Sequence, residues 1–94
     1  MVYIGYFKFS LSVPWANSLK DRRQLAQKCR DKLKTTYNAS VKLNYGDDIR
    51  RFDIYVCMLA EDRDYLSKSA GQIESFFDEN LSLIVSSEVD IESW

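Results

Sequence analysis

Histidine is absent from the 94 residues, while proline occurs once, cysteine twice and glycine three times. Without histidine the chain cannot form a Ser–His or Cys–His catalytic pair, and most zinc sites would lose a usual ligand. No apolar run approaches the roughly 18–20 residues of a membrane span, and no secretory leader is seen. These absences predict one cytoplasmic domain over residues 1–94, with no membrane association, metal or cofactor.

The two cysteines fit a reduced protein. Cys29 and Cys57 do not form a C-x-x-C pair, and each lies in a segment of apolar periodicity. We interpret both as small hydrophobic side chains rather than a disulfide. The alternation of residues 51–60 nevertheless directs Cys57 to the outer face of its strand.

Hydrophobic periodicity predicts six elements. Alternating β-branched and aromatic residues predict strands over residues 2–13, 39–45, 51–60 and 81–92. Apolar residues at helical spacing predict helices over residues 19–36 and from residue 61 to about residue 80. The βαββαβ order is typical of the ferredoxin-like α+β plait, a four-stranded antiparallel sheet with two helices on one face. Right-handed crossovers then give the strand order 4-1-3-2.

The sheet face opposite the helices has no partner within such a chain. Alternation turns Val85 inward and places on this face the side chains of Val2, Ile4, Tyr6, Lys8, Tyr55, Cys57, Leu59 and Ile84. Because an apolar patch of this kind marks a contact surface, we expect a homodimer formed through this face or through a sheet edge. RNA stacking on Tyr6 and Tyr55, as in the RRM, is an alternative, but the RNP1 pattern is absent. Scattered surface apolar residues are the plainest alternative.

Charge is segregated along the chain although the net charge is −1. Residues 1–46 carry nine Lys/Arg and two acids, whereas residues 47–94 carry four Lys/Arg and twelve acids. Seven cations fall between Lys20 and Lys34, on the solvent face of the first predicted helix. Such clustering is typical of a phosphate-backbone contact. The alternative is a solvated face that balances acids of the second helix, and the pI of 5.3 argues against strong general nucleic-acid binding.

The first turn of this helix suggests an anion site. Ser18 is expected to cap the helix and Leu19 to anchor it to the sheet, while Lys20, Arg22 and Arg23 project around the turn. Cations at a helix N-terminus oppose the helix dipole, so an anionic ligand would offset their cost. The candidate RNA or anion ligands are therefore Ser18, Lys20, Arg22, Arg23, Arg30 and Lys34.

The segment Ser18-Leu19-Lys20-Asp21-Arg22-Arg23 resembles the S-L-K-x-[KR]-R motif of the YlxP-like family, small bacterial proteins of unknown function. A long first strand ending near Pro14 and the stretch Tyr37-Asn38-Ala39-Ser40-Val41 extend the resemblance over nearly the whole chain. It implies a ferredoxin-like fold and, through the neighbourhood of the family's genes, a role linked to translation or ribosome maturation. Lys42-Leu43 stands where the family usually has an acid, and Asp48 lacks the usual following Trp, so the chain resembles a divergent member.

Candidate catalytic residues do not emerge. Asp47-Asp48 fits a turn, and Asp62-Arg63-Asp64 fits the start of a helix. Residues 12–17 lack the Gly-rich anion loop of acylphosphatases, which share the plait. We therefore expect a non-enzymatic binding protein that contacts RNA or a ribosomal component. The alternatives are a homodimeric protein-interaction module with no nucleic-acid role, or a small-ligand sensor with its pocket between subunits.

Overall fold

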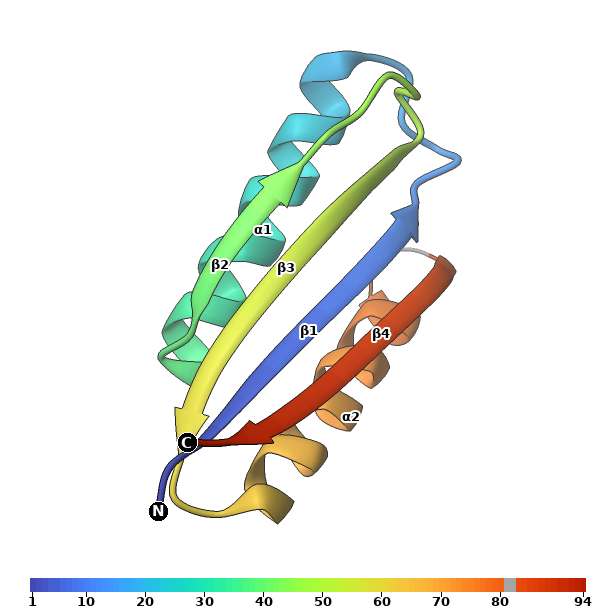
Figure 1. Cartoon of the computed structure of the whole chain (residues 1–94). Coiled ribbons are helices and arrows are strands. Elements are labelled where there is room, and N and C mark those ends of the chain that lie inside the picture. Colours follow the sequence, from blue (N-terminus) through green and yellow to red (C-terminus); the bar gives the residue numbers. More distant parts are fainter. Residues whose placement is uncertain (81–82) are drawn as a thin grey trace.

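The computed structural model describes residues 1–80 and 83–94. Its elements are β1 (Tyr3–Ser12), α1 (Leu19–Tyr37), β2 (Ser40–Asn44), β3 (Arg51–Ala60), α2 (Arg63–Asn80) and β4 (Leu83–Ser93). The strands pair antiparallel in the order β2-β3-β1-β4, and both helices cover one face of the sheet (Figure 1). The predicted ferredoxin-like plait is confirmed, while the expected start of the last strand at residues 81–82 lies outside the described residues.

The core lies between the helices and one face of the sheet. Strand alternation supplies its sheet side with Phe7, Phe9, Leu11, Phe52, Ile54, Val56 and Met58, all at most 3% exposed. The helices supply Ala26, Cys29, Leu33, Leu66, Ile73 and Phe77. The rings of Phe9 and Phe77 pack edge to face, with centroids 5.4 Å apart.

No helix in the described part of the chain is long and apolar enough to cross a membrane.

Local hydrogen bonds fix both ends of α1. The Ser18 Oγ accepts from the backbone N–H of Asp21 at 3.1 Å, and the Asp21 carboxylate accepts from the N–H of Asn17 at 3.1 Å. This reciprocal pair confirms the predicted cap. Asn38 ends the helix in the left-handed region, with φ 50°, and its N–H donates to the Lys34 carbonyl. Leu19 is 54% exposed and does not anchor the helix, because the first turn lies beside the β2–β3 loop rather than over the sheet.

A register shift in β4 overturns the prediction for Ile84. Ser10 of β1 pairs with Ser86, whereas the next residue, Leu11, pairs with Ile84. The extra residue, Val85, reverses the alternation of the strand. Ile84 therefore lies half-buried against the core on the helix side, not on the open face. Val85, expected inward, is 48% exposed.

Gly5 gives a first stability prediction. A Cβ at this position would lie 3.0 Å from Cζ of Phe7 and 3.3 Å from Cδ2 of Leu66. Both atoms belong to the packed core, so we expect Gly5→Ala to lower the free energy of unfolding by about 1–2 kcal/mol, measured by urea denaturation. Gly71→Ala on α2 is the matched control, because nothing lies within 4 Å of its added Cβ. It should raise the free energy of unfolding by about 0.5–1 kcal/mol; equal effects of the two substitutions would contradict this account.

Candidate functional site

The structure removes Arg22 from the set of exposed cations. Its side chain is 6% exposed, and Nη1 donates to the carbonyl oxygens of Tyr45, Gly46 and Asp48 at 2.9, 3.2 and 2.8 Å. The guanidinium carbon also lies 4.9 Å from the centre of the Tyr45 ring. The expectation that Arg22 projects into solvent beside Lys20 and Arg23 is therefore wrong. The physical reason is that the β2–β3 loop turns its carbonyl groups toward the first turn of α1, and this guanidinium satisfies them.

Four of the predicted cations form a stripe on α1, which we call the basic flank: Lys20, Arg23, Arg30 and Lys34. At 100° per residue they fall within about 80° of one another around the helix axis. Arg23 and Arg30 line a groove between α1 and the edge strand β2, with a cavity volume of about 560 Å³. Lys42 of β2 lines the same groove and adds a fifth cation. Sequence reasoning missed Lys42, because its place beside Arg23 and Arg30 depends on how α1 packs along β2 in the folded chain.

Little of this positive charge is neutralised by neighbouring acids. The ion pair found among residues 1–80 and 83–94 joins Arg30 Nε to Asp31 Oδ1 at 3.0 Å, and both side chains are at least 36% exposed. An exposed pair of this kind is worth little. The acids of α2 form no ion pair with α1 within the described part of the chain.

Ser18 is already engaged as the helix cap. Its Oγ accepts from the N–H of Asp21, and the Asp21 carboxylate lies against the same turn. A carboxylate there supplies the negative charge that the helix dipole favours. The positive groups available to an external anion therefore lie along the flank of α1 rather than at its N-terminus.

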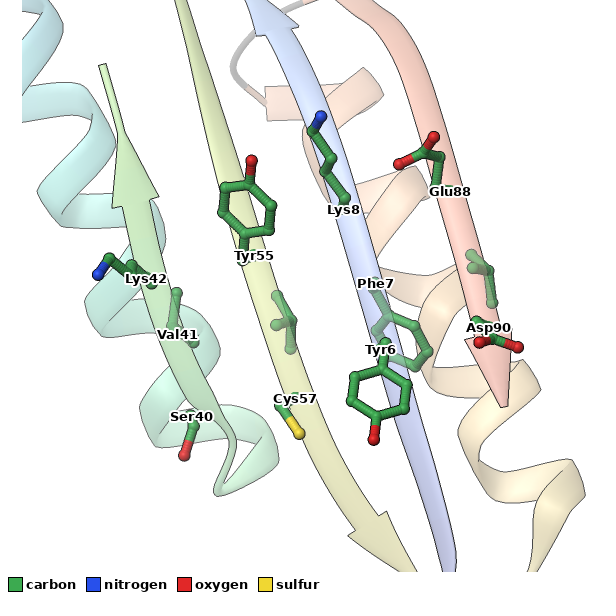
Figure 2. A pocket seen from close by; sticks show the side chains of 12 residues that line it. Tyr6, Phe7, Lys8, Ser40, Val41, Lys42, Tyr55, Cys57, Glu88 and Asp90 are labelled. Atoms are coloured by element: carbon green, nitrogen blue, oxygen red, sulfur yellow. The ribbon is translucent and has the colours of Figure 1, made fainter. Parts of the chain in front are cut away.

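A second surface covers the sheet face opposite the helices, which we call the open face. The structure places the predicted side chains of Ile4, Tyr6, Lys8, Tyr55, Cys57 and Leu59 on this face. Leu59 is 67% exposed, and Tyr6 is 44% exposed. Lys8 Nζ lies 5.6 Å from the centre of the Tyr55 ring, a cation–π geometry. A shallow depression of about 570 Å³ crosses all four strands here (Figure 2).

Charges of opposite sign flank the apolar centre of the open face. Strand pairing aligns one cross-strand row as Lys42, Tyr55, Lys8 and Glu88, and a second row as Ser40, Cys57, Tyr6 and Asp90. Glu92 continues the acidic edge opposite Ile4. Figure 2 shows Lys42 on β2 at one edge and Glu88 and Asp90 on β4 at the other. This polarity was not predicted, because it depends on the register between neighbouring strands.

The two thiols differ in environment, and both are free. Burial raises the pKa of Cys29 from 9.0 to about 12. Cys57 is half-buried on the open face, as the alternation of its strand predicted. In the part of the chain that the structure describes, no three Cys, Asp or Glu side chains gather as metal ligands.

The strand order and the placement of both helices define the class: a ferredoxin-like α+β plait. Within this class, residues 4–89 match the family described as "Protein of unknown function (DUF503)", and the chain belongs to that family. No curated protein matches the chain significantly in sequence.

Solved structures of similar fold come from several bacteria. A putative antibiotic biosynthesis monooxygenase from Bordetella bronchiseptica aligns with TM-score 0.53 and 12% identity, covering 97% of this chain and 96% of its own. SnoaB, a cofactor-independent oxygenase from Streptomyces nogalater, aligns with TM-score 0.52 and 8% identity over 98% and 92%. A dimeric protein of unknown function from Bacteroides fragilis aligns with TM-score 0.51 and 8% identity over 98% and 96%. At such identities the likeness shows the fold alone.

Proposed function

We propose that this protein is a non-enzymatic RNA-binding protein that holds a phosphate backbone along the basic flank of α1. One observation carries the proposal: Lys20, Arg23, Arg30 and Lys34 line up on one side of the helix, beside Lys42 and a groove. Successive helical turns repeat the cations at intervals of about 5.4 Å or its multiples. A row of this kind suits the repeated charges of a nucleic-acid strand better than one small anion.

The buried Arg22 supports this arrangement indirectly. By binding three carbonyl groups of the β2–β3 loop, it ties the first turn of α1 to the end of β2. The basic flank and Lys42 are thereby held on the two sides of one groove. Arg22 is a positioning residue in this proposal, and the ligands of the phosphate groups are the exposed cations.

The non-enzymatic part of the proposal rests on the roles of the available groups. The chain has no histidine. The Asp48 carboxylate accepts from the N–H of Arg50 at 2.9 Å, and the Asp62 carboxylate accepts from the N–H of Asp64 at 2.9 Å. These acids serve local turns. The resemblance of residues 18–23 to YlxP-like proteins favours a cytoplasmic RNA linked to translation, such as a ribosomal RNA, as the partner.

Charge reversal tests the proposal. We expect Arg23→Glu combined with Lys34→Glu to weaken binding of single-stranded RNA and of ribosomal subunits by at least tenfold near 0.1 M salt. The slope of log affinity against log salt should fall by about 1.4, because each lost phosphate contact to a single strand contributes roughly 0.7. Fluorescence anisotropy across a salt series measures both quantities.

The matched control is Lys28→Glu combined with Lys32→Glu. These two residues are exposed on the same helix but lie outside the basic flank, and the pair changes the net charge by the same amount. The control should bind nearly as well as the unmodified protein. Equal losses in both pairs, or no RNA binding even at low salt, would overturn the proposal.

A further inference from the structure

The open face has the size and composition of an interface. Strand spacing and residue rise give a four-stranded face of about 19 by 33 Å, so two such faces would bury on the order of 1,200 Å², the lower end of the range for stable complexes. The face carries Ile4, Tyr6, Tyr55 and Leu59, and the last three are at least 37% exposed. Exposed aromatic and aliphatic side chains in one patch are typical of a surface that another protein covers.

We infer that the partner on this face is a second copy of the chain, stacked sheet to sheet about a two-fold axis parallel to the strands. Such an axis places β2 of each copy over β4 of the other, and β3 over β1. Lys42 then faces the partner's Glu88, because both residues belong to the same cross-strand row. The symmetry repeats this contact, so each dimer contains two such pairs.

The same stacking also brings apolar side chains of the two copies opposite one another. Tyr6 faces the partner's Cys57, and Ile4 faces the partner's Leu59, since each pair shares a row across β1 and β3. Tyr55 faces the partner's Lys8, the residue type that already lies over the Tyr55 ring within one chain. The centre of the dimer would thus combine apolar and aromatic side chains with Lys8 against Tyr55, and Lys42 and Glu88 would lie at the rim.

The charges on the two edge strands favour the axis parallel to the strands over an axis perpendicular to them. A two-fold axis perpendicular to the strands would place β4 over the partner's β4, bringing together two sets of acids: Glu88, Asp90 and Glu92 from each copy. It would also place β2, with Lys42, over the partner's β2. Like charges opposed in this way disfavour a complex by several kcal/mol, whereas the parallel axis opposes unlike charges at both edges.

A charge-swap cycle tests the inference. We expect the unmodified protein to sediment as a dimer, with twice the mass of the 11.0 kDa chain. Lys42→Glu and Glu88→Lys should each raise the dimer dissociation constant at least tenfold, because each replaces two attractive pairs by two repulsive ones. Combining both substitutions should restore the dimer. Asp78→Lys on the exposed side of α2 is the control for charge alone and should leave dimerisation unchanged.

Cys57 offers an independent readout. In the proposed dimer, Cys57 and the partner's Cys57 lie near the axis, offset sideways by about one strand spacing of 4.8 Å. A short bismaleimide should therefore join two chains of the unmodified protein, and Cys57→Ser should abolish the product. Cys29 is buried and does not compete for the reagent.

A monomer at all accessible concentrations would overturn the inference. So would a dimer that survives Tyr6→Asp and both single charge reversals, because its interface would lie elsewhere. Failure of the combined charge swap to restore the dimer would reject the parallel axis. The RNA proposal is tested by different residues, Arg23 and Lys34, so failure of one proposal leaves the other standing.

Discussion

Arg22→Ala is expected to lower the free energy of unfolding by about 3 kcal/mol, because it removes a buried guanidinium and its three charge-assisted hydrogen bonds to the β2–β3 loop. For a domain of this size, such a loss corresponds to a fall in Tm of roughly 12–24 °C. The guanidinium now serves the carbonyl groups of Tyr45, Gly46 and Asp48 and stacks on the Tyr45 ring.

Two companion variants separate the causes. Arg22→Lys keeps the charge but provides a compact ammonium in place of a planar guanidinium, so we expect it to recover less than half of the lost stability. Arg23→Ala changes the adjacent, exposed cation and should cost less than about 0.5 kcal/mol. Urea denaturation measures all three variants, and hydrogen exchange should show faster opening of residues 45–51 in Arg22→Ala. Equal stability of Arg22→Ala and Arg23→Ala would contradict the structural role of Arg22.

The two thiols should react with a maleimide at rates that differ at least a hundredfold near pH 8. Burial raises the pKa of Cys29 to about 12, so its thiolate fraction is far below that of an ordinary thiol, and the reagent also needs local opening to reach it. Cys57 lies on the open face and should react readily at low protein concentration. Cys57→Ser and Cys29→Ala isolate the two rates, and mass spectrometry follows them.

In urea the two rates should converge, because unfolding removes the burial that protects Cys29. The raised pKa also makes the free energy of unfolding depend on pH. The contribution of the neutral Cys29 thiol to this free energy is complete below pH 9 and is lost as the pH rises toward 12. Cys29→Ala should lack this particular loss at high pH. Comparable labelling of both thiols in the folded protein would show that the space around Cys29 opens far more often than its packing indicates.

The sequence pattern was sufficient to predict the architecture, because the core residues recur with the period of a strand or of a helix. Phe7, Phe9 and Leu11 alternate along β1, while Ala26, Cys29 and Leu33 recur at helical spacing, and all six are buried. The same periodicity placed Ile84 on the wrong face of the sheet. Alternation turned Val85 inward and Ile84 outward, and the shift between Ser10 and Leu11 that reverses this assignment is a property of strand pairing.

The candidate site was predictable only where it lies on one element. The spacing of Lys20, Arg23, Arg30 and Lys34 on a single helix places them together from sequence alone. The burial of Arg22 was not visible, because its partners are backbone carbonyl groups 23 to 26 residues away along the chain. The position of Lys42 and Glu88 at the two ends of one cross-strand row likewise needed the register of the strands.

The contacts of Arg22 also determine where the chain tolerates insertion. Residues 45–48 look like the most permissive segment of the sequence, since they contain a glycine and two acids between strands. Their carbonyl groups are nevertheless fixed to a side chain of another element, and tolerance of a length change depends on such backbone contacts. Residues added at Gly46 or Asp47 would move the carbonyl groups of this loop out of hydrogen-bond distance of the Arg22 guanidinium. A peptide tag should therefore be accepted poorly in this turn, and length variation among related chains should avoid it.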